Sequence, residues 1–189
     1  MDTLLQAFSE AIPVWEQAIL GMFWYHGLGF AAYLGTAWLC LLNGHIAEQS
    51  GEGHAMWYAA AALLCLLAAN TVLHGDLLLL QVLRAVAKLE GWYGERRQVQ
   101  YLVIAALAAT AWFAAGWYRT RLRAADDASG PVAWGLAGLL MILALRAVSA
   151  HGVDQVLDLR LAGISVGRLL EFSCLGWVAH GALRRLSVR

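Results

Sequence analysis

The chain has 189 residues, of which 61% are apolar and only 14% are charged, and its mean hydropathy is +0.61. Soluble domains contain about 25% charged residues, so this composition excludes a disordered chain and an ordinary soluble domain. The 13 basic and 13 acidic residues cancel, which argues against nucleic acid as a partner. We expect a small membrane protein whose first partner is the lipid bilayer.

Five stretches of the chain lack Asp, Glu, Lys and Arg. They are residues 17–47, 53–75, 98–118, 128–145 and 172–183. A helix needs about 20 mostly apolar residues to cross the hydrocarbon core, and the alternating pattern of a barrel strand is absent. We therefore predict helices at about 18–42, 56–83, 98–119, 132–150 and 167–183, which form one all-α domain over residues 1–189, an integral membrane bundle of about five transmembrane helices.

The amino terminus has no Lys or Arg before its first apolar run, so we expect that run to stay as an anchor rather than to act as a cleaved signal. Side A is defined as the membrane face of the amino terminus, with the predicted loops 84–97 and 151–166. Side B holds the predicted loops 43–55 and 120–131 and the carboxyl terminus. Each side carries six Lys and Arg residues, so the distribution of positive charge does not orient the chain.

Polar residues inside these spans gather in the half of the bundle nearer side A. His26 lies about 12 Å from the side-A end of its helix, and His74 and Asp76 lie about 10–14 Å from theirs. Arg146 and Glu171 each lie about one turn from the same face. An ionisable residue at such depth is costly and marks a functional site, so the sequence predicts a polar site in the side-A half.

Two features refine the predicted second helix. Asn70, His74, Gln81, Arg84 and Lys88 follow a helical spacing and are predicted to form one stripe. Asp76 lies about 200° around the helix from His74, so both can face one cavity only if Gly75 loosens the turn.

The pair His151 and Asp154 is the candidate for catalysis. The two residues are three apart and lie on one face if the fourth helix continues past Ala150. A carboxylate beside an imidazole fixes its tautomer and raises its basicity, which suits a general base or a metal ligand. His26 and His74 are candidate ligands of a metal ion or of haem on facing helices.

Each of these residues also has a purely structural interpretation. Arg168 and Glu171 have the spacing of a local ion pair, and His26 can hydrogen-bond a neighbouring helix. Asn70 and Gln81 can join helices by polar contacts.

Two blocks of sequence, and two acidic residues that flank them, carry a resemblance. Gly91-Trp92-Tyr93 is followed by Arg96, Arg97 and Gln100; Arg146 is followed by Ser149, His151, Val153 and Asp154; and Asp76 precedes both blocks, as Glu171 follows them. This pattern resembles an uncharacterised family of small bacterial polytopic inner-membrane proteins. The resemblance implies a multi-pass protein of the bacterial inner membrane and one recurring set of residues (Asp76, Arg96, Arg97, Arg146, His151, Asp154 and Glu171), but no activity.

Three functions fit these residues. The first is a ligand- or metal-binding protein whose side-A site takes, or acts on, a lipid, quinone or isoprenoid head group. There Arg96, Arg97, Arg146, Asp76 and Glu171 bind the ligand, because arginine forms paired contacts with phosphate and carboxylate. The second is a non-enzymatic accessory or assembly subunit of a larger membrane complex, such as a bioenergetic one, with partner subunits. The third is a carrier of haem or a chlorophyll-type pigment. The sequence leaves the cofactor and any enzymatic activity open.

Overall fold

The computed structural model describes residues 2–20, 24–91, 94, 129–148, 151–161 and 163–187. The side chains at 2, 18–20, 24–26, 147–148 and 151–154 lie outside that description, although the helices that contain them are described. The predicted helix at about 98–119 lies outside the described residues.

The described part of the chain is helical apart from one small hairpin. Its elements are α1 (Asp2–Leu20), α2 (Trp24–Gln49), α3 (Ala55–Leu73), α4 (Gly75–Leu89), α6 (Ser129–Val148), α7 (His151–Asp158), β1 (Arg160–Leu161), β2 (Ile164–Ser165) and α8 (Val166–Ser187). The two strands are antiparallel, with Arg160 opposite Ser165 and Leu161 opposite Ile164. The expected all-α architecture is therefore confirmed for this part of the chain.

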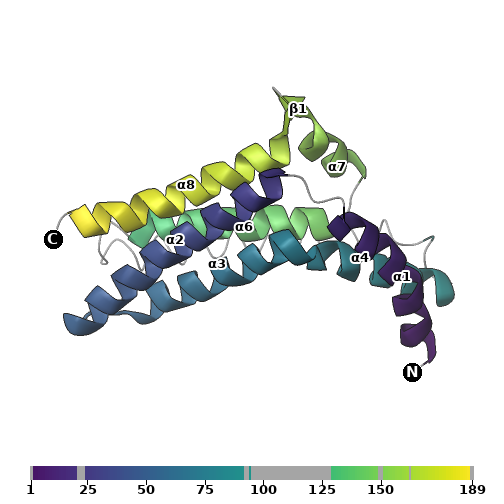
Figure 1. Cartoon of the computed structure of the whole chain (residues 1–189), viewed down its shortest axis with the longest axis horizontal. Coiled ribbons are helices and arrows are strands. Elements are labelled where there is room, and N and C mark those ends of the chain that lie inside the picture. Colours follow the sequence, from purple (N-terminus) through teal and green to yellow (C-terminus); the bar gives the residue numbers. More distant parts are fainter. Residues whose placement is uncertain are drawn as a thin grey trace.

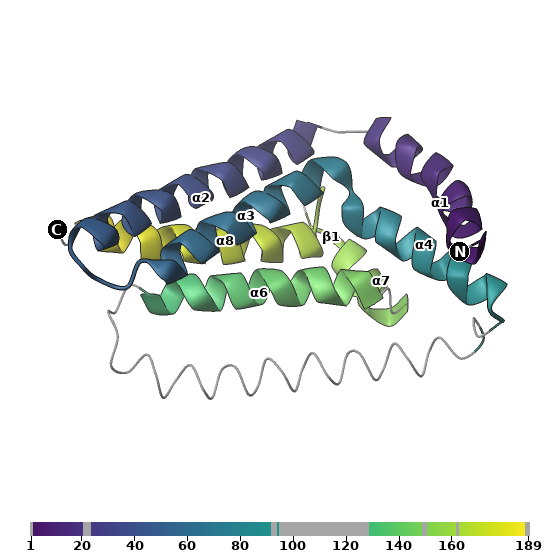
Figure 2. The same cartoon turned by 90° about the horizontal axis from the view of Figure 1, so that it is seen from below.

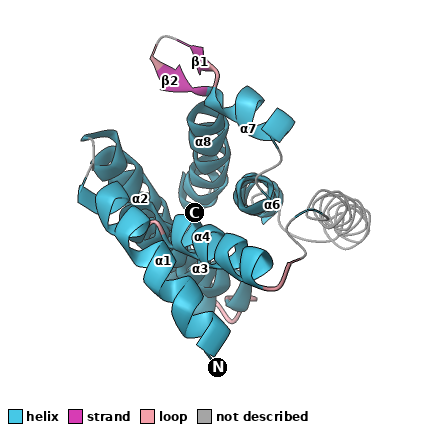
Figure 3. Cartoon of the chain, turned by 90° about the vertical axis from the view of Figure 1, so that its right-hand side faces the viewer, coloured by secondary structure: helices cyan, strands magenta, loops and turns pink. Residues whose placement is uncertain are grey.

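Among the described elements, four helices run along the long axis of the molecule, and the others lie at one end. Helices α2, α3, α6 and α8 form the bundle, with α2 packed against α3 and α8 packed against both α2 and α6 (Figures 1 and 2). The α2–α3 turn and the carboxyl terminus lie at one end. Helices α1, α4 and α7 lie at the other, and the β1–β2 hairpin stands there beside the start of α8 (Figure 3).

Small residues let the bundle helices approach each other closely. A Cβ atom added to Gly135 of α6 would lie 2.7 Å from the carbonyl oxygen of Cys174 in α8, and one added to Gly138 would lie 2.6 Å from the Cys174 sulfur. Trp57 and Leu64 of α3 fill the centre and are almost fully buried. Such close backbone approach is how helices gain van der Waals contact in lipid, where apolar surface alone gives no drive to associate.

Three helices in the described residues are long and apolar enough to cross a membrane: Gly27–Gln49 within α2, Ala55–Leu73, and Ser129–Arg146 within α6. Large apolar side chains cover their outer surfaces, with Leu66 68% and Trp38 61% exposed. These features indicate association with a membrane. The count of about five transmembrane helices is not confirmed, because α8 carries four charged residues and the 98–119 segment lies outside the described residues.

The first predicted helix has wrong boundaries. Residues 2–20 form a separate helix, α1, and α2 runs from Trp24 to Gln49 instead of from about 18 to 42. Helix α1 escapes a search for uncharged stretches because its outer face carries Glu10 and Glu16. It is held by its other face, where Ala7 and Ala11 pack on α4.

The second predicted helix, 56–83, is wrong as a continuous element, because it breaks at His74. That residue takes a left-handed backbone conformation with φ of 48°, and it ends α3 and begins α4. Side chains replace two of the helical hydrogen bonds that the break removes. Trp15 of α1 donates its indole N–H to the carbonyl oxygen of Leu73 at 2.6 Å, and the amide N–H of Asp76 donates to Oδ1 of Asn70 at 3.1 Å.

Two further expectations fail for related reasons. The polar residues from Asn70 to Lys88 do not form one stripe, because the break changes the rotation between α3 and α4. The segment 151–166 is not a plain loop, since it contains α7 and the β1–β2 hairpin. The helices predicted at 132–150 and 167–183 correspond to α6 and α8, with ends that differ by one to four residues.

Candidate functional site

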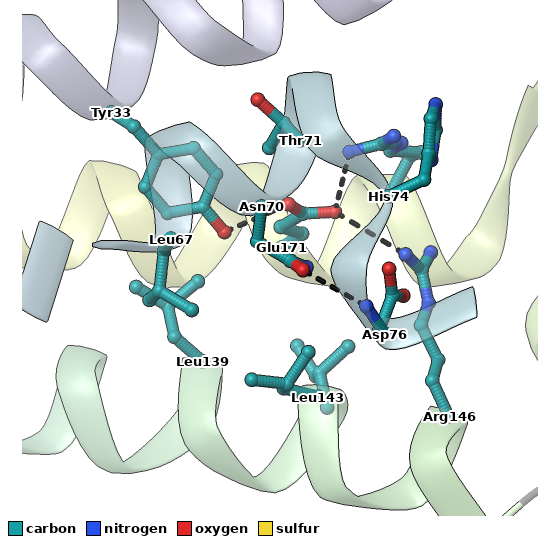
Figure 4. Close-up of a pocket in the computed structure, with 12 residues that line it drawn as sticks. Tyr33, Leu67, Asn70, Thr71, His74, Asp76, Leu139, Leu143, Arg146 and Glu171 are labelled. Atoms are coloured by element: carbon teal, nitrogen blue, oxygen red, sulfur yellow. Dashed lines mark hydrogen bonds and ion pairs between the residues drawn. The ribbon is translucent and has the colours of Figure 1, made fainter. Parts of the chain in front are cut away.

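A cavity of about 60 Å³ lies where α2, α3, α4, α6 and α8 meet, towards the end of the bundle that carries α4 and α7. Figure 4 shows the side chains that line it. Twelve residues line it: Tyr33, Leu67, Asn70, Thr71, His74, Asp76, Leu139, Ile142, Leu143, Arg146, Arg168 and Glu171. At about 30 Å³ for each water molecule, this volume corresponds to about two water molecules, or to a polar group of similar size. Apolar side chains of α3 and α6 make one wall, and the rest is made by charged side chains of α4, α6 and α8 and by uncharged polar side chains of α2 and α3.

Glu171 is the centre of the polar contacts in this cavity. It extends from α8 and is only 8% exposed. Its Oε1 accepts a 2.7 Å hydrogen bond from the hydroxyl of Tyr33 on α2, and its Oε2 accepts a 3.0 Å bond from Nη1 of Arg168. Nη1 of Arg146 on α6 lies 3.9 Å from the same oxygen. A buried charge is unfavourable unless it is paired and hydrogen-bonded, so this carboxylate ties three helices together.

The break between α3 and α4 brings His74 and Asp76 to the same cavity. On an unbroken helix they would face different directions, whereas here both line the cavity wall (Figure 4). Asp76 belongs to the first turn of α4, where the positive end of the helix dipole favours a carboxylate. Gly75 fits the turn because an added Cβ atom would lie 3.2 Å from Oδ1 of Asn70.

Two oppositely charged side chains in the cavity, those of Asp76 and Arg146, have hydrogen-bonding groups that other described residues do not use. Among the described residues, the Asp76 carboxylate makes no hydrogen bond or ion pair, and the Arg146 guanidinium makes only its 3.9 Å approach to Glu171. The Arg146 side chain is 32% exposed. Both side chains point into the cavity (Figure 4), and no ion pair joins them.

Gly167 leaves room for the end of the Arg146 side chain. A Cβ atom added at this position of α8 would lie 2.8 Å from Nη2 of Arg146, and 3.4 Å from the carbonyl oxygen of Leu157 in α7. The glycine therefore sets where the guanidinium can lie.

The structure brings together four of the residues that the sequence singled out: His74, Asp76, Arg146 and Glu171. It also forms the ion pair expected between Arg168 and Glu171. The roles of these residues as ligands of a bound molecule stay predictions.

The side chains of the other site residues predicted from the sequence lie outside the described part of the structure. Arg96 and Arg97 lie outside the described residues. His151 and Asp154 belong to α7, and His26 belongs to α2, but their side chains are not described. Within the described part of the chain, no group of three or more His, Cys, Asp and Glu side chains could hold a metal ion. The catalytic, metal and haem assignments therefore remain predictions.

Sequence reasoning missed Tyr33 and Thr71, which both line the cavity. Tyr33 carried a usable signal, because a tyrosine well inside an apolar span needs a partner for its hydroxyl. Its partner lies 138 positions away in the sequence, so the identity of that partner could not be inferred.

Buried polar residues also lie at the other end of the bundle, away from the half in which the sequence predicts them. Arg185 near the end of α8 is 7% exposed, pairs with Glu52 of the α2–α3 turn, and lies 5.0 Å from the ring centre of Trp57. Asn43 of α2 is fully buried, and its side-chain amide donates a 3.0 Å hydrogen bond to the carbonyl oxygen of Ala182. These contacts fasten α8 to α2 and α3.

Comparison with known proteins finds no matching family model, no similar curated protein and no similar solved structure.

Proposed function

We propose that this chain is a multi-pass protein of the bacterial inner membrane that binds the polar head group of a membrane-resident amphiphile, of the lipid, quinone or isoprenoid class. In this proposal α2, α3, α6, α8 and the 98–119 segment each cross the bilayer. The cavity beside Glu171 receives the head group, and the attached apolar chain lies between helices or along their outer surface.

The observation that carries the proposal is the convergence of charged side chains on one cavity in an otherwise apolar bundle. Asp76, Arg146 and Glu171 come from three different helices and line the same space. Ionisable groups are expensive in a membrane and are found there where they serve a ligand, an ion or a proton path. A purely structural ion pair would need only Arg168 and Glu171, which already bond each other.

The length of the helices supports the choice of a head group. Helix α3 has 19 residues and α6 has 20, which correspond to about 28 and 30 Å, close to the thickness of the hydrocarbon core. His74 ends α3 and Arg146 lies in the last turn of α6. If α3 and α6 match the core, the cavity lies where hydrocarbon meets head groups.

The composition of the cavity wall fits an amphiphile. Leu139, Ile142 and Leu143 of α6 line one side, and Arg146 continues the same helix into the polar side. A molecule with a polar head and an apolar chain satisfies both. Any chemistry on the head group is assigned to His151 and Asp154, whose helix α7 packs against α8 at this end; binding itself does not need it.

Native mass spectrometry of the protein, released gently from its own membranes, tests the proposal. We expect an adduct of discrete mass that Arg146→Gln loses. The matched control is Arg184→Gln, an exposed arginine near the other end of α8, which keeps the adduct. An adduct that survives Arg146→Gln, or a bare protein, would overturn the proposal, and a stable complex with other subunits and no amphiphile would favour the accessory role instead.

A further inference from the structure

The positive and negative charges that line the cavity are equal in number, but not all of them form ion pairs with one another. The cavity holds two guanidinium groups, of Arg146 and Arg168, and two carboxylates, of Asp76 and Glu171. Arg168 and Glu171 form a short ion pair, and the hydroxyl of Tyr33 occupies the second oxygen of Glu171. These groups build the wall, and their bonding capacity is largely used within it.

Asp76 and Arg146 are different, because they line the same cavity without bonding each other. In the described part of the chain the Asp76 carboxylate has no side-chain partner, and the Arg146 guanidinium only approaches Glu171 at 3.9 Å. Asp76 can accept hydrogen bonds from a cation, and Arg146 can donate a paired contact to an anion. One cavity therefore offers one site of each sign.

We infer that the ligand is a zwitterion, with an ammonium group held by Asp76 and a phosphate group held by Arg146. This inference rests on the proposed function and names its ligand class. An anionic head group would leave Asp76 facing negative charge, which is unfavourable at low dielectric. A neutral head group would leave both charged side chains without a counter-charge. A zwitterion satisfies both and keeps the cavity neutral.

The same geometry selects among ammonium groups. A primary ammonium has three N–H donors, whereas a quaternary one has none to give Asp76. Phosphoethanolamine is the simplest group with a primary ammonium next to a phosphate. It can come from phosphatidylethanolamine in the bilayer or exist free in water, and the experiment separates these two sources.

The test is a binding titration of the purified protein in detergent, read by native mass spectrometry, with dioctanoyl phosphatidylethanolamine, phosphatidylglycerol and phosphatidylcholine, and with free phosphoethanolamine. We expect the affinity for phosphatidylethanolamine to be at least about tenfold higher than for the other two lipids, because each of those lacks a charged hydrogen bond to Asp76. Asp76→Asn should remove most of this preference, and Arg146→Gln should weaken phosphatidylethanolamine and phosphatidylglycerol alike. Asp76→Asn keeps the size of the side chain, whereas Arg146→Gln shortens it, and the melting temperatures of both variants show whether they fold.

Two controls match the variants. Glu90→Gln removes an exposed carboxylate at the far end of α4, and Arg184→Gln removes an exposed guanidinium on α8; neither should change the preference. Equal binding of phosphatidylethanolamine and phosphatidylglycerol, unchanged by Asp76→Asn, would overturn the zwitterion inference and leave the head-group site standing. Binding of no lipid and no phosphoethanolamine would overturn both. Free phosphoethanolamine that binds as tightly as its lipid would support the zwitterion and refute the amphiphile.

Discussion

Replacing Glu171 by glutamine removes one negative charge from the centre of the cavity and keeps the shape of the side chain. Glu171 is 8% exposed, and it pairs with Arg168, whose side chain is 15% exposed. Breaking a fully buried ion pair destabilises a protein by about 3–5 kcal/mol, because the remaining charge stays uncompensated. Because water reaches part of Arg168 and of Arg146, we expect Glu171→Gln to cost less than a fully buried pair would, about 2–3 kcal/mol of unfolding free energy.

Thermal unfolding in detergent micelles, followed by tryptophan fluorescence, measures this change. For a chain of 189 residues, about 2–3 kcal/mol corresponds to a melting temperature lower by about 4–12 °C. Tyr33→Phe alone should cost about 1–2 kcal/mol, since its hydroxyl bonds a charged oxygen at 2.7 Å. In the Glu171→Gln background the same change should cost less, because the hydrogen bond then joins neutral groups.

The chain provides a matched control for this pair. Tyr58 donates a 2.8 Å hydrogen bond to Oε2 of Glu48, and this contact is exposed. Glu48→Gln should therefore change stability by less than about 0.5 kcal/mol. If Glu171→Gln costs no more than Glu48→Gln, the argument that Glu171 ties three helices together is refuted.

Three further predictions concern other parts of the molecule. Gly167→Ala should leave the melting temperature within a few degrees of wild type but weaken head-group binding, because its Cβ atom displaces the flexible end of Arg146; unchanged affinity in the lipid titration would contradict it. Gly135→Ala should destabilise the protein by about 1–3 kcal/mol, because the new Cβ atom would lie 2.7 Å from a backbone carbonyl oxygen of α8. Gly176→Ala should not destabilise it, because a Cβ atom there would have nothing within 4 Å. Equal free energies of unfolding for the two variants would refute this packing. Cys65 lies mid-way along α3 and is exposed on the surface of the protein. In intact membranes a charged maleimide should therefore not label Cys65, although it should label a cysteine placed in the α2–α3 turn. Labelling of Cys65 would show that this face of α3 meets water.

Much of the bundle could be predicted because the absence of charge over about 20 residues is a signal of composition. Helices α2, α3 and α6 each lie in such a stretch. The break at His74 could not be predicted in this way, because hydropathy does not register tertiary hydrogen bonds. The bond from Trp15 to the Leu73 carbonyl spans 58 positions. Helix α1 was missed for a similar reason, since Ala7 and Ala11 pack on a helix far along the chain.

The candidate site was partly predictable for an energetic reason. Asp76, Arg146 and Glu171 stood out because charges in apolar segments are unfavourable without a purpose. That Asp76 and His74 meet in one cavity depends on the break in the helix, which the sequence allowed at Gly75 but did not require. Tyr33 was missed because its ring suits an apolar helix, and only its hydroxyl, bonded to Glu171, reveals its place in the site.

Site-specific photocrosslinking in living membranes tests the central claim most directly. A diazirine amino acid is placed either at Leu143, which lines the cavity, or at Leu140, which is 44% exposed on the same helix. The account predicts that position 143 captures one amphiphile of discrete mass, that Arg146→Gln abolishes this capture, and that position 140 captures bulk lipids in proportion to their abundance. Capture of the same lipid mixture at both positions, or capture of only protein at position 143, would contradict it.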